Sequence, residues 1–353
     1  MKKRNRRNKV KQSVLEKYFD NVPNAYDISS DTKLVAKNEY GGYEIKISEI
    51  YNGTIKNAST YTMYVDINNE KVPIPNGYTV SSKSTENTVK NGLVISDSRG
   101  NEYVWIPCTM NELSDKLKYQ RTEWYVEDDQ DTKAIKDELT LTVLDVTYSE
   151  NDIKYGITSE ISKEIVAQIK AEKESISKYG GYYIGRYETG KSGETAVIKA
   201  SQEPYAEIIW SQAYSLAKGI GGGTGATTYL CSSYAWDTAI NFIENNGAKD
   251  YATKITGFNG NWEGQQVVKN GEVIKQANES ERLKTGLTTA WSNIYDMGGN
   301  IAEFTTEINP GTSETIVLSG GDFYGNGPSG NRWDHSSGYS GYDNGFRVTL
   351  FLK

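Results

Sequence analysis

Hydrophobic and polar residues alternate along two early stretches of the chain. Residues 43–50 (Tyr-Glu-Ile-Lys-Ile-Ser-Glu-Ile) and 61–67 (Tyr-Thr-Met-Tyr-Val-Asp-Ile) follow the two-residue period of half-buried β-strands. The pattern predicts a small β-rich N-terminal module over residues 21–69. Residues 1–20 before it are predicted to be a basic tail with a short amphipathic helix at 13–19.

A proline- and glycine-rich stretch marks the end of this module. Pro73, Pro75 and Gly77 lie close together there, and we expect a second, larger domain over residues 70–353. Helical and strand patterns follow one another irregularly in it, which favours an α+β domain over a doubly wound sheet. The predicted elements are a strand-turn-strand at 93–107, a helix at 157–178, a strand at 182–188, helices at 210–217 and 236–244, a hairpin region at 257–281 and a last strand at 348–352.

Composition and charge narrow the class of protein. The chain has 26 Tyr but only 7 Phe, so much of its aromatic surface is expected at wet boundaries. A net charge of -7 argues against a specific nucleic-acid binder, and the basic run at 2–11 is interpreted as a solvated tail rather than an RNA or lipid contact. No apolar run is long enough for a membrane span, and no signal peptide is predicted. We expect cytoplasmic synthesis, and a place in a phage particle or at a cell surface stays open.

Reactive side chains are few. Cys108 and Cys231 lie far apart in the sequence, without metal-binding spacing, and each is expected to be a small core residue; a disulfide between them is left open. His335 is the one histidine, which excludes multi-histidine metal sites. Its neighbours are Ser, Gly and Asp, so we interpret it as a surface contact residue rather than a catalytic base.

Residues 320–347 are built almost wholly from Gly, Ser, Asn, Asp and Tyr, and Lys, Glu, Gln and Met are absent from 322–344. This mixture of rigid aromatic and adaptable polar side chains is typical of combining sites. The alternative is an ordinary glycine-rich surface loop. As ligand-binding residues the segment offers Asp322, Tyr324, Asn326, Asn331, Asp334, His335, Ser336, Tyr339, Tyr342 and Asp343.

Residues 293–305 read Asn-Ile-Tyr-Asp-Met-Gly-Gly-Asn-Ile-Ala-Glu-Phe-Thr. This block resembles the Asp-Met-x-Gly-Asn-x-x-Glu-Trp signature of formylglycine-generating-enzyme-like (sulfatase-modifying factor) domains. The resemblance covers residues 72–353, and it implies a C-type-lectin-like fold of the formylglycine-generating-enzyme subtype. Further blocks that resemble the family in the same order lie at 103–107, 183–188, 209–213, 319–321 and 345–348.

The chain departs from the catalytic members of this family. They use a late pair of cysteine thiolates to bind copper, whereas this chain has no cysteine after Cys231. The iron-dependent relatives need several histidines, and His335 stands alone. The resemblance therefore implies a scaffold without a catalytic cofactor, and we expect no enzyme activity.

The sequence is most similar to the variable proteins of diversity-generating retroelements. In them a C-terminal segment, here 321–347, is rewritten at the adenines of Asn codons. Such codons never become Lys, Glu, Gln, Met or Trp, so the composition of 322–344 fits except at Trp333, which we expect to be a fixed framework residue. A core that holds this segment is expected around Trp105, Trp210, Trp236 and Trp291.

The same resemblance implies a structural calcium ion. Its ligands would be the carboxylates of Asp296 and Glu303 with the carbonyls of Gly299 and Ile301, because Ca²⁺ prefers oxygen donors. The alternative is that both carboxylates bind loop backbone or pair with Arg347. We expect Arg332 and Arg347 to be internal pins rather than ligand contacts.

These observations predict a non-catalytic protein that binds a protein or glycan through its C-terminal segment. The N-terminal module is of the kind that assembles subunits or attaches to a larger particle. Two rival functions stay open, a formylglycine-generating-type enzyme and a calcium-dependent carbohydrate-binding protein.

Overall fold

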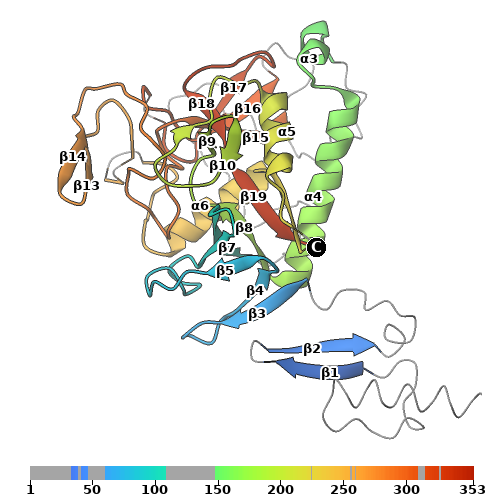
Figure 1. The fold of residues 1–353 in the computed structure, drawn as a ribbon. Coiled ribbons are helices and arrows are strands. Elements are labelled where there is room, and N and C mark those ends of the chain that lie inside the picture. The colour runs from blue at the N-terminus through green and yellow to red at the C-terminus, as the bar shows by residue number, and fades with distance from the viewer. Residues whose placement is uncertain are drawn as a thin grey trace, which may run out of the picture. The chain divides into compact units, whose positions relative to one another are not determined.

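The chain divides into two compact units, Met1–Met63 and Tyr64–Lys353. In the first, β1 (Lys33–Asn38) and β2 (Gly41–Lys46) form an antiparallel hairpin (Figure 1). The helix predicted at 13–19 lies outside the described residues. The computed structural model describes residues 33–38, 41–46, 60–108, 148–223, 225–254, 257–258, 260–308, 315–325 and 327–353.

A six-stranded antiparallel sheet is the base of the larger unit. The last strand of the chain, β19 (Val348–Leu352), lies in this sheet between two strands from the middle of the sequence. These are β12 (Ala226–Leu230) and β8 (Gly181–Gly185). In spatial order the strands are β12 (Ala226–Leu230), β19 (Val348–Leu352), β8 (Gly181–Gly185), β7 (Glu102–Pro107), β6 (Val94–Asp97) and β5 (Tyr78–Val80). The predicted hairpin at 93–107 and the predicted last strand at 348–352 are confirmed.

Helix α4 (Ser159–Tyr179) packs on β8 and β19 of this sheet (Figure 1). Thr158 caps its first turn by accepting a hydrogen bond from the Ile161 amide, and Gly180 ends it in the left-handed conformation. The helix predicted at 157–178 is therefore confirmed, with its boundaries set by these two caps.

A second, four-stranded sheet carries the C-terminal segment. Its order is β17 (Arg332–His335), β16 (Ile316–Ser319), β15 (Ala302–Ile308) and β18 (Asn344–Phe346). All neighbours are antiparallel except β15 and β18, which are parallel. Strand β17 is thus at one edge of this sheet.

Helices α5 (Trp210–Ile220) and α6 (Ser233–Asn245) contact strands of both large sheets. The indole of Trp210 donates to the Thr305 carbonyl, and that of Trp236 donates to the Ser329 carbonyl. Trp105, Trp210 and Trp236 are buried as expected, whereas Trp291 is only half-buried. The fold is α+β, as predicted.

Shorter elements complete the fold. β3 (Tyr61–Val65) pairs with β4 (Lys71–Pro75), so this hairpin spans residue 69, where we predicted the end of the N-terminal module. The domain division stays a prediction. The other short elements are α3 (Glu150–Lys154), β9 (Gly190–Ser192), β10 (Thr195–Val197), β11 (Glu203–Pro204), β13 (Val267–Lys269) and β14 (Glu272–Lys275).

Candidate ligand-binding surface

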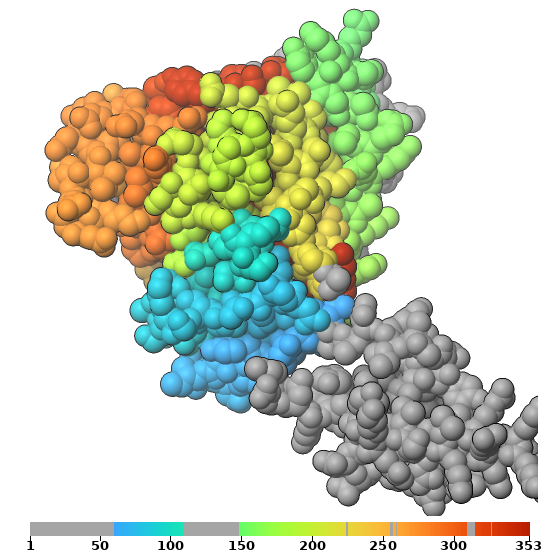
Figure 2. Space-filling model, viewed as in Figure 1, coloured from blue at the N-terminus to red at the C-terminus, as the bar shows by residue number. Residues whose placement is uncertain are grey.

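The C-terminal segment, residues 320–347, leaves β16 through a tight glycine turn. A Cβ atom at Gly321 would lie 2.1 Å from the carbonyl oxygen of Gly327, so only glycine allows this approach. The Gly320 amide donates to the Asn331 carbonyl at 3.0 Å. The segment therefore folds back on itself before it enters β17. In Figure 2 this region, in red, lies along the upper edge between α3 and the orange 260–280 region.

Arg332 fixes the start of β17 to the core. Its Nη2 donates to both carboxylate oxygens of Asp237 on α6, at 2.9 and 2.8 Å, and its Nε donates to Glu307 of β15 at 3.1 Å. All three side chains are largely buried. Two-point contacts of this kind fix orientation as well as position. The prediction that Arg332 is an internal pin is confirmed.

Arg347 fixes the C-terminal end of the segment. It donates to both oxygens of Glu303, at 2.9 and 2.6 Å, and neither side chain is exposed. Its remaining donors reach the carbonyls of Gly185, Tyr295 and Asp296 at 2.9, 2.9 and 3.3 Å. This residue is also an internal pin, as predicted.

Three buried carboxyl groups surround this single guanidinium. Burial raises the pKa of Glu303 to about 7, against the opposing effect of Arg347. Burial likewise raises the pKa of Asp296, and it raises the pKa of Glu188 well above its usual range, with further contributions from Asp296 and Glu303. The cluster is therefore expected to retain protons that exposed carboxyl groups would release.

The two carboxylates of the predicted calcium site already accept hydrogen bonds from protein groups. Asp296 accepts from the Gly286 amide at 3.1 Å and from the Thr288 hydroxyl, and Glu303 binds Arg347. These are the contacts of the alternative interpretation. The described residues contain no group of three or more His, Cys, Asp or Glu side chains that could hold a metal. Calcium at Asp296, Gly299, Ile301 and Glu303 stays untested, and its entry would have to displace these donors.

Three aromatic side chains of the segment face solvent. Tyr324, Trp333 and Tyr342 are 39%, 40% and 49% exposed, and among the described residues no other aromatic side chain is exposed. The Tyr324 and Tyr342 rings meet edge-to-face, with centroids 5.6 Å apart and planes at 85°. Phe323 is buried beside them, 4.3 Å from the Tyr324 ring and 5.7 Å from the Tyr342 ring. We call Phe323, Tyr324 and Tyr342 the aromatic cluster.

Trp333, which we expected to be a fixed framework residue, is not part of the buried core. It lies on β17, the edge strand of the second sheet, and its side chain is 40% exposed. Its indole nitrogen donates to the Gly320 carbonyl at 3.0 Å, which is the one hydrogen bond that orients this ring. This hydrogen bond connects the Trp333 side chain to the turn at Gly320 rather than to the core.

Four polar residues lie together beside the aromatic cluster. His335 stacks on Tyr339 with ring centroids 4.1 Å apart, and the Tyr339 hydroxyl donates to Asp343 at 3.3 Å. Asp322 accepts from two backbone amides of its own turn. Burial raises the pKa of Asp322, the hydrogen bond from the Gly325 amide opposes this, and the nearby Asp343 and His335 raise and lower it, respectively.

The remaining predicted binding residues are distributed differently. Asn331 is half-buried inside the glycine turn, and Asp334 lies opposite Val317 in the sheet register. Ser336 directly follows β17 and is half-buried. Asn326 lies outside the described residues. The structure therefore brings together Asp322, Tyr324, His335, Tyr339, Tyr342 and Asp343.

Sequence reasoning missed the support that α3 gives to this segment. A Cβ atom at Gly338 would lie 2.4 Å from the ring of Tyr155, which ends α3, so ring and backbone are in close contact. Asn151 also donates to the Ser337 hydroxyl at 3.3 Å. One feature of the sequence could have indicated α3: Ser149 and Asp152 have the spacing of a capping box, which marks the start of a helix.

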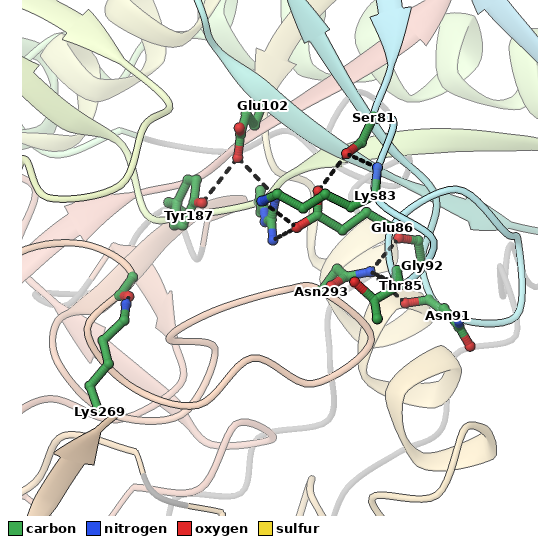
Figure 3. A network of polar contacts seen from close by, with 12 residues as sticks. Ser81, Lys83, Thr85, Glu86, Asn91, Gly92, Glu102, Tyr187, Lys269 and Asn293 are labelled. Atoms are coloured by element: carbon green, nitrogen blue, oxygen red, sulfur yellow. Dashed lines mark hydrogen bonds and ion pairs between the residues drawn. The ribbon is translucent and has the colours of Figure 1, made fainter. Parts of the chain in front are cut away.

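A second polar network, also missed, contains Arg186 together with Glu86, Glu102 and Tyr187, and Figure 3 labels the last three. The Arg186 guanidinium donates to Glu86 at 2.8 Å and Glu102 at 3.1 Å, and Glu102 also accepts from Tyr187. Burial raises the pKa of Glu86, but hydrogen bonds from Arg186 and Ser81 outweigh this and lower it to about 2. The network connects the loop before β6 to β7 and to the residues after β8.

Asn293 extends this network to the family-like block at 293–305. Its amide nitrogen donates to the carbonyls of Thr85, Asn91 and Gly92 at 2.8 to 2.9 Å (Figure 3). On the other side, the Lys269 ammonium donates to the Gly286 carbonyl and lies 5.6 Å from the centre of the Tyr295 ring. The contacts of this network join parts of the protein to one another, which indicates a structural role.

The two cysteines are buried thiols that are not joined in a disulfide. Burial raises the pKa of Cys108 to about 12, so its thiol is protonated at neutral pH. A protonated thiol is a poor nucleophile and a poor metal ligand. Burial therefore disfavours, at Cys108, the thiolate chemistry that the enzyme rival would need.

No protein-family model matches the chain, and no curated protein matches it. Similar solved structures include Treponema denticola variable protein 1, at 17% identity over 48% of this chain and 84% of that one, with a TM-score of 0.35. CarF matches at 14% identity over 49% of this chain and 87% of that one, with a TM-score of 0.33. PvdO from Pseudomonas aeruginosa matches at 14% identity over 74% of this chain and 98% of that one, with a TM-score of 0.39. These scores do not establish a shared fold.

No helix among the described residues is long and apolar enough to cross a membrane.

Proposed function

We propose that this protein binds a macromolecular ligand, a protein or a glycan, through its C-terminal segment and carries out no chemistry on it. The observation that carries the proposal is that exposed aromatic side chains and buried side chains occur together in one segment. The aromatic residues exposed among those described all lie between Tyr324 and Tyr342, while Arg332, Phe346 and Arg347 of the same segment are held inside. Exposed aromatic side chains on a fixed frame are typical of binding hot spots.

The geometry supports a rigid mode of recognition. Arg332 and Arg347 fix the segment at two points, and Tyr155 packs against Gly338 between them. A surface that is ordered before binding loses less entropy on association. The aromatic rings would supply the contact area, and Asp322, His335 and Asp343 would set polar specificity.

The scaffold we propose is a C-type-lectin-like domain of the formylglycine-generating-enzyme subtype, in a variable protein of a diversity-generating retroelement. Its support is the ordered set of sequence blocks and the composition of 322–344. Trp333 fits as an invariant position because its indole is tied to the Gly320 carbonyl. A reverse-transcriptase gene beside a near-copy of the codons for 321–347, mismatched only at adenines, would support this; a locus without such a copy would contradict it.

The binding function can be tested without knowing the ligand. The protein is applied to arrays of glycans and of bacterial surface proteins, beside a variant with Tyr324, Trp333 and Tyr342 changed to Ser. A control variant carries Ser at Met63, Val65 and Ile67, which are 44%, 47% and 91% exposed elsewhere. We expect specific array signals from the parent and the control, and their loss in the aromatic variant. Signals that survive in the aromatic variant would refute the proposed surface.

A further inference from the structure

A groove separate from the C-terminal segment lies between α4 and the β12 edge of the six-stranded sheet. Ala171, Ser175 and Tyr179 line it from one face of α4, at the four-residue spacing of neighbouring helical turns. Tyr229 of β12 and Phe351 of β19 line it from the sheet. Figure 1 shows α4 running beside β19. None of the described residues that line the groove belongs to 320–347, so it is a second candidate site.

The sheet side of the groove is aromatic. Tyr229 lies opposite Thr349, and Phe351 follows Thr349 by two residues, so the Tyr229 and Phe351 side chains project from the same face of the sheet. Their ring centroids are 6.1 Å apart and their planes meet at 54°. Tyr182 stacks on the Phe351 ring, with centroids 5.2 Å apart, and holds it in place. The groove therefore offers an aromatic ligand two fixed rings at an angle to each other.

One polar side chain of the groove lacks a partner. Ser175 is 4% exposed, and its hydroxyl makes no hydrogen bond with any described residue. A serine inside a helix can bond to the carbonyl four residues earlier, but this hydroxyl does not. Tyr179 differs, because its hydroxyl donates to the Lys353 carbonyl. Since a buried hydroxyl without a partner is costly, Ser175 is a group that a ligand could satisfy.

The size of the groove limits what it can hold. Its volume is about 210 Å³, compared with about 150 Å³ for a protein cavity that holds benzene. Pockets for drug-sized molecules are larger, at about 300–1,000 Å³. The space therefore suits one aromatic ring with a small substituent. Glu174 and Lys178 also line the groove, and because their charges are opposite they give no preference for a charged ligand.

We propose that this groove binds a small, uncharged molecule with one aromatic ring and a hydroxyl group on that ring. The ring would contact Tyr229 and Phe351, and the ligand hydroxyl would bond to that of Ser175. Two hydroxyl groups suit each other because each can donate or accept. The inference goes beyond the proposed binding of a macromolecule and does not depend on it.

The test uses the full-length protein and two probes, 4-fluorophenol and fluorobenzene, which differ by the hydroxyl group. Broadening of the fluorine NMR signal measures the affinity for each probe, even when binding is weak. We expect 4-fluorophenol to bind about five-fold more tightly, the factor that one typical hydrogen bond supplies. Ser175→Ala should remove this preference and leave the affinity for fluorobenzene unchanged. Ala171→Leu, which fills the groove, should abolish the binding of both probes.

Two control variants should retain the preference for 4-fluorophenol. Ser177→Ala removes a hydroxyl from an exposed position of the same helix, and Tyr324→Ser with Tyr342→Ser removes exposed rings of the C-terminal segment. Urea unfolding checks the fold of each variant, and Ser175→Ala should be at least as stable as the parent because it removes only an unpartnered hydroxyl. Equal affinities for the two probes, no broadening with the parent, or a preference that survives Ser175→Ala would overturn the proposal.

Discussion

The pinned and the exposed side chains of the C-terminal segment are built on opposite principles. Arg332 and Arg347 are enclosed by carboxylates and backbone carbonyls, and most of their donors have a protein partner. Tyr324 and Tyr342, by contrast, contact mainly each other and Phe323, with much of each ring in solvent. The pinned positions are specified by the fold, whereas the exposed positions could change without disturbing it.

This difference has a physical consequence for mutation. A buried charge that loses its partner remains in a medium that solvates it poorly, which destabilises the protein strongly. A half-exposed ring that is removed loses only part of its contact area. Tolerance of substitution should therefore change sharply over a few residues.

The largest effect is expected at Arg347. Arg347→Met leaves Glu303 buried without its bidentate partner, and we expect a loss of about 3–5 kcal/mol in the free energy of unfolding. Urea unfolding at neutral pH measures it. Lys218→Met, at an exposed pair with Glu164, is the control and should cost less than about 1 kcal/mol. Equal losses at Lys218 and Arg347 would erase the contrast between buried and exposed ion pairs.

The carboxyl cluster predicts a pH dependence. Because the pKa of Glu303 is raised to about 7 and that of Glu188 is raised as well, the folded state holds protons that the unfolded chain releases above its usual value of 4.5. This stabilisation is complete below the unfolded pKa and is lost as pH rises through the folded pKa. We expect stability to fall by about 1–3 kcal/mol between about pH 5 and pH 8.

Glu188→Gln separates this cluster from the other titrating groups. The variant keeps the shape of the side chain but cannot ionise, so its stability should fall less steeply over the same pH range. Urea unfolding of both proteins at matched pH values gives the difference in slope. Parallel slopes would show that Glu188 titrates alike in the folded and unfolded states.

A smaller loss of stability is expected when Trp333 is replaced. Since the ring is 40% exposed and has one hydrogen bond, Trp333→Ala should cost about 1 kcal/mol. Trp236→Ala, in the core, should cost about 3–5 kcal/mol. Thermal or urea unfolding of the two variants side by side distinguishes them, and a core-sized loss at Trp333 would restore it to the framework.

Calcium is expected to have the smallest effect. The carboxylates of Asp296 and Glu303 already accept hydrogen bonds from protein donors. After exhaustive chelation, added Ca²⁺ should leave Tm unchanged. A bound structural ion would instead stabilise by about 2.7 kcal/mol at 100 times its Kd, and a rise in Tm that Asp296→Ala abolishes would establish the site.

Local features of this fold were predictable from sequence, because nearby residues encode them. Helix α4 follows its apolar period and ends at Gly180, and the β6–β7 hairpin follows from alternation around a turn. The Arg186–Glu86 pair, 100 residues apart, was not predictable, since nothing local relates the two positions. The parallel pairing of β15 with β18 likewise depends on how intervening loops pack.

The candidate site was predictable in part for the same reason. Composition singled out the segment, and the family resemblance suggested its two arginine pins. It did not show that the Trp333 side chain is exposed, and it did not separate Asn331 in the turn from Tyr342 on the surface. Exposure depends on neighbours that only the folded chain supplies.

The most direct test of the account is saturation mutagenesis of residues 321–347, with protease resistance of each displayed variant as the measure of folding. We predict that Tyr324, His335, Tyr339 and Tyr342 accept most residues, while Arg332, Phe346 and Arg347 accept few. Uniform intolerance along the segment would contradict the account, because the exposed positions would then be part of the folded framework rather than a surface presented by it.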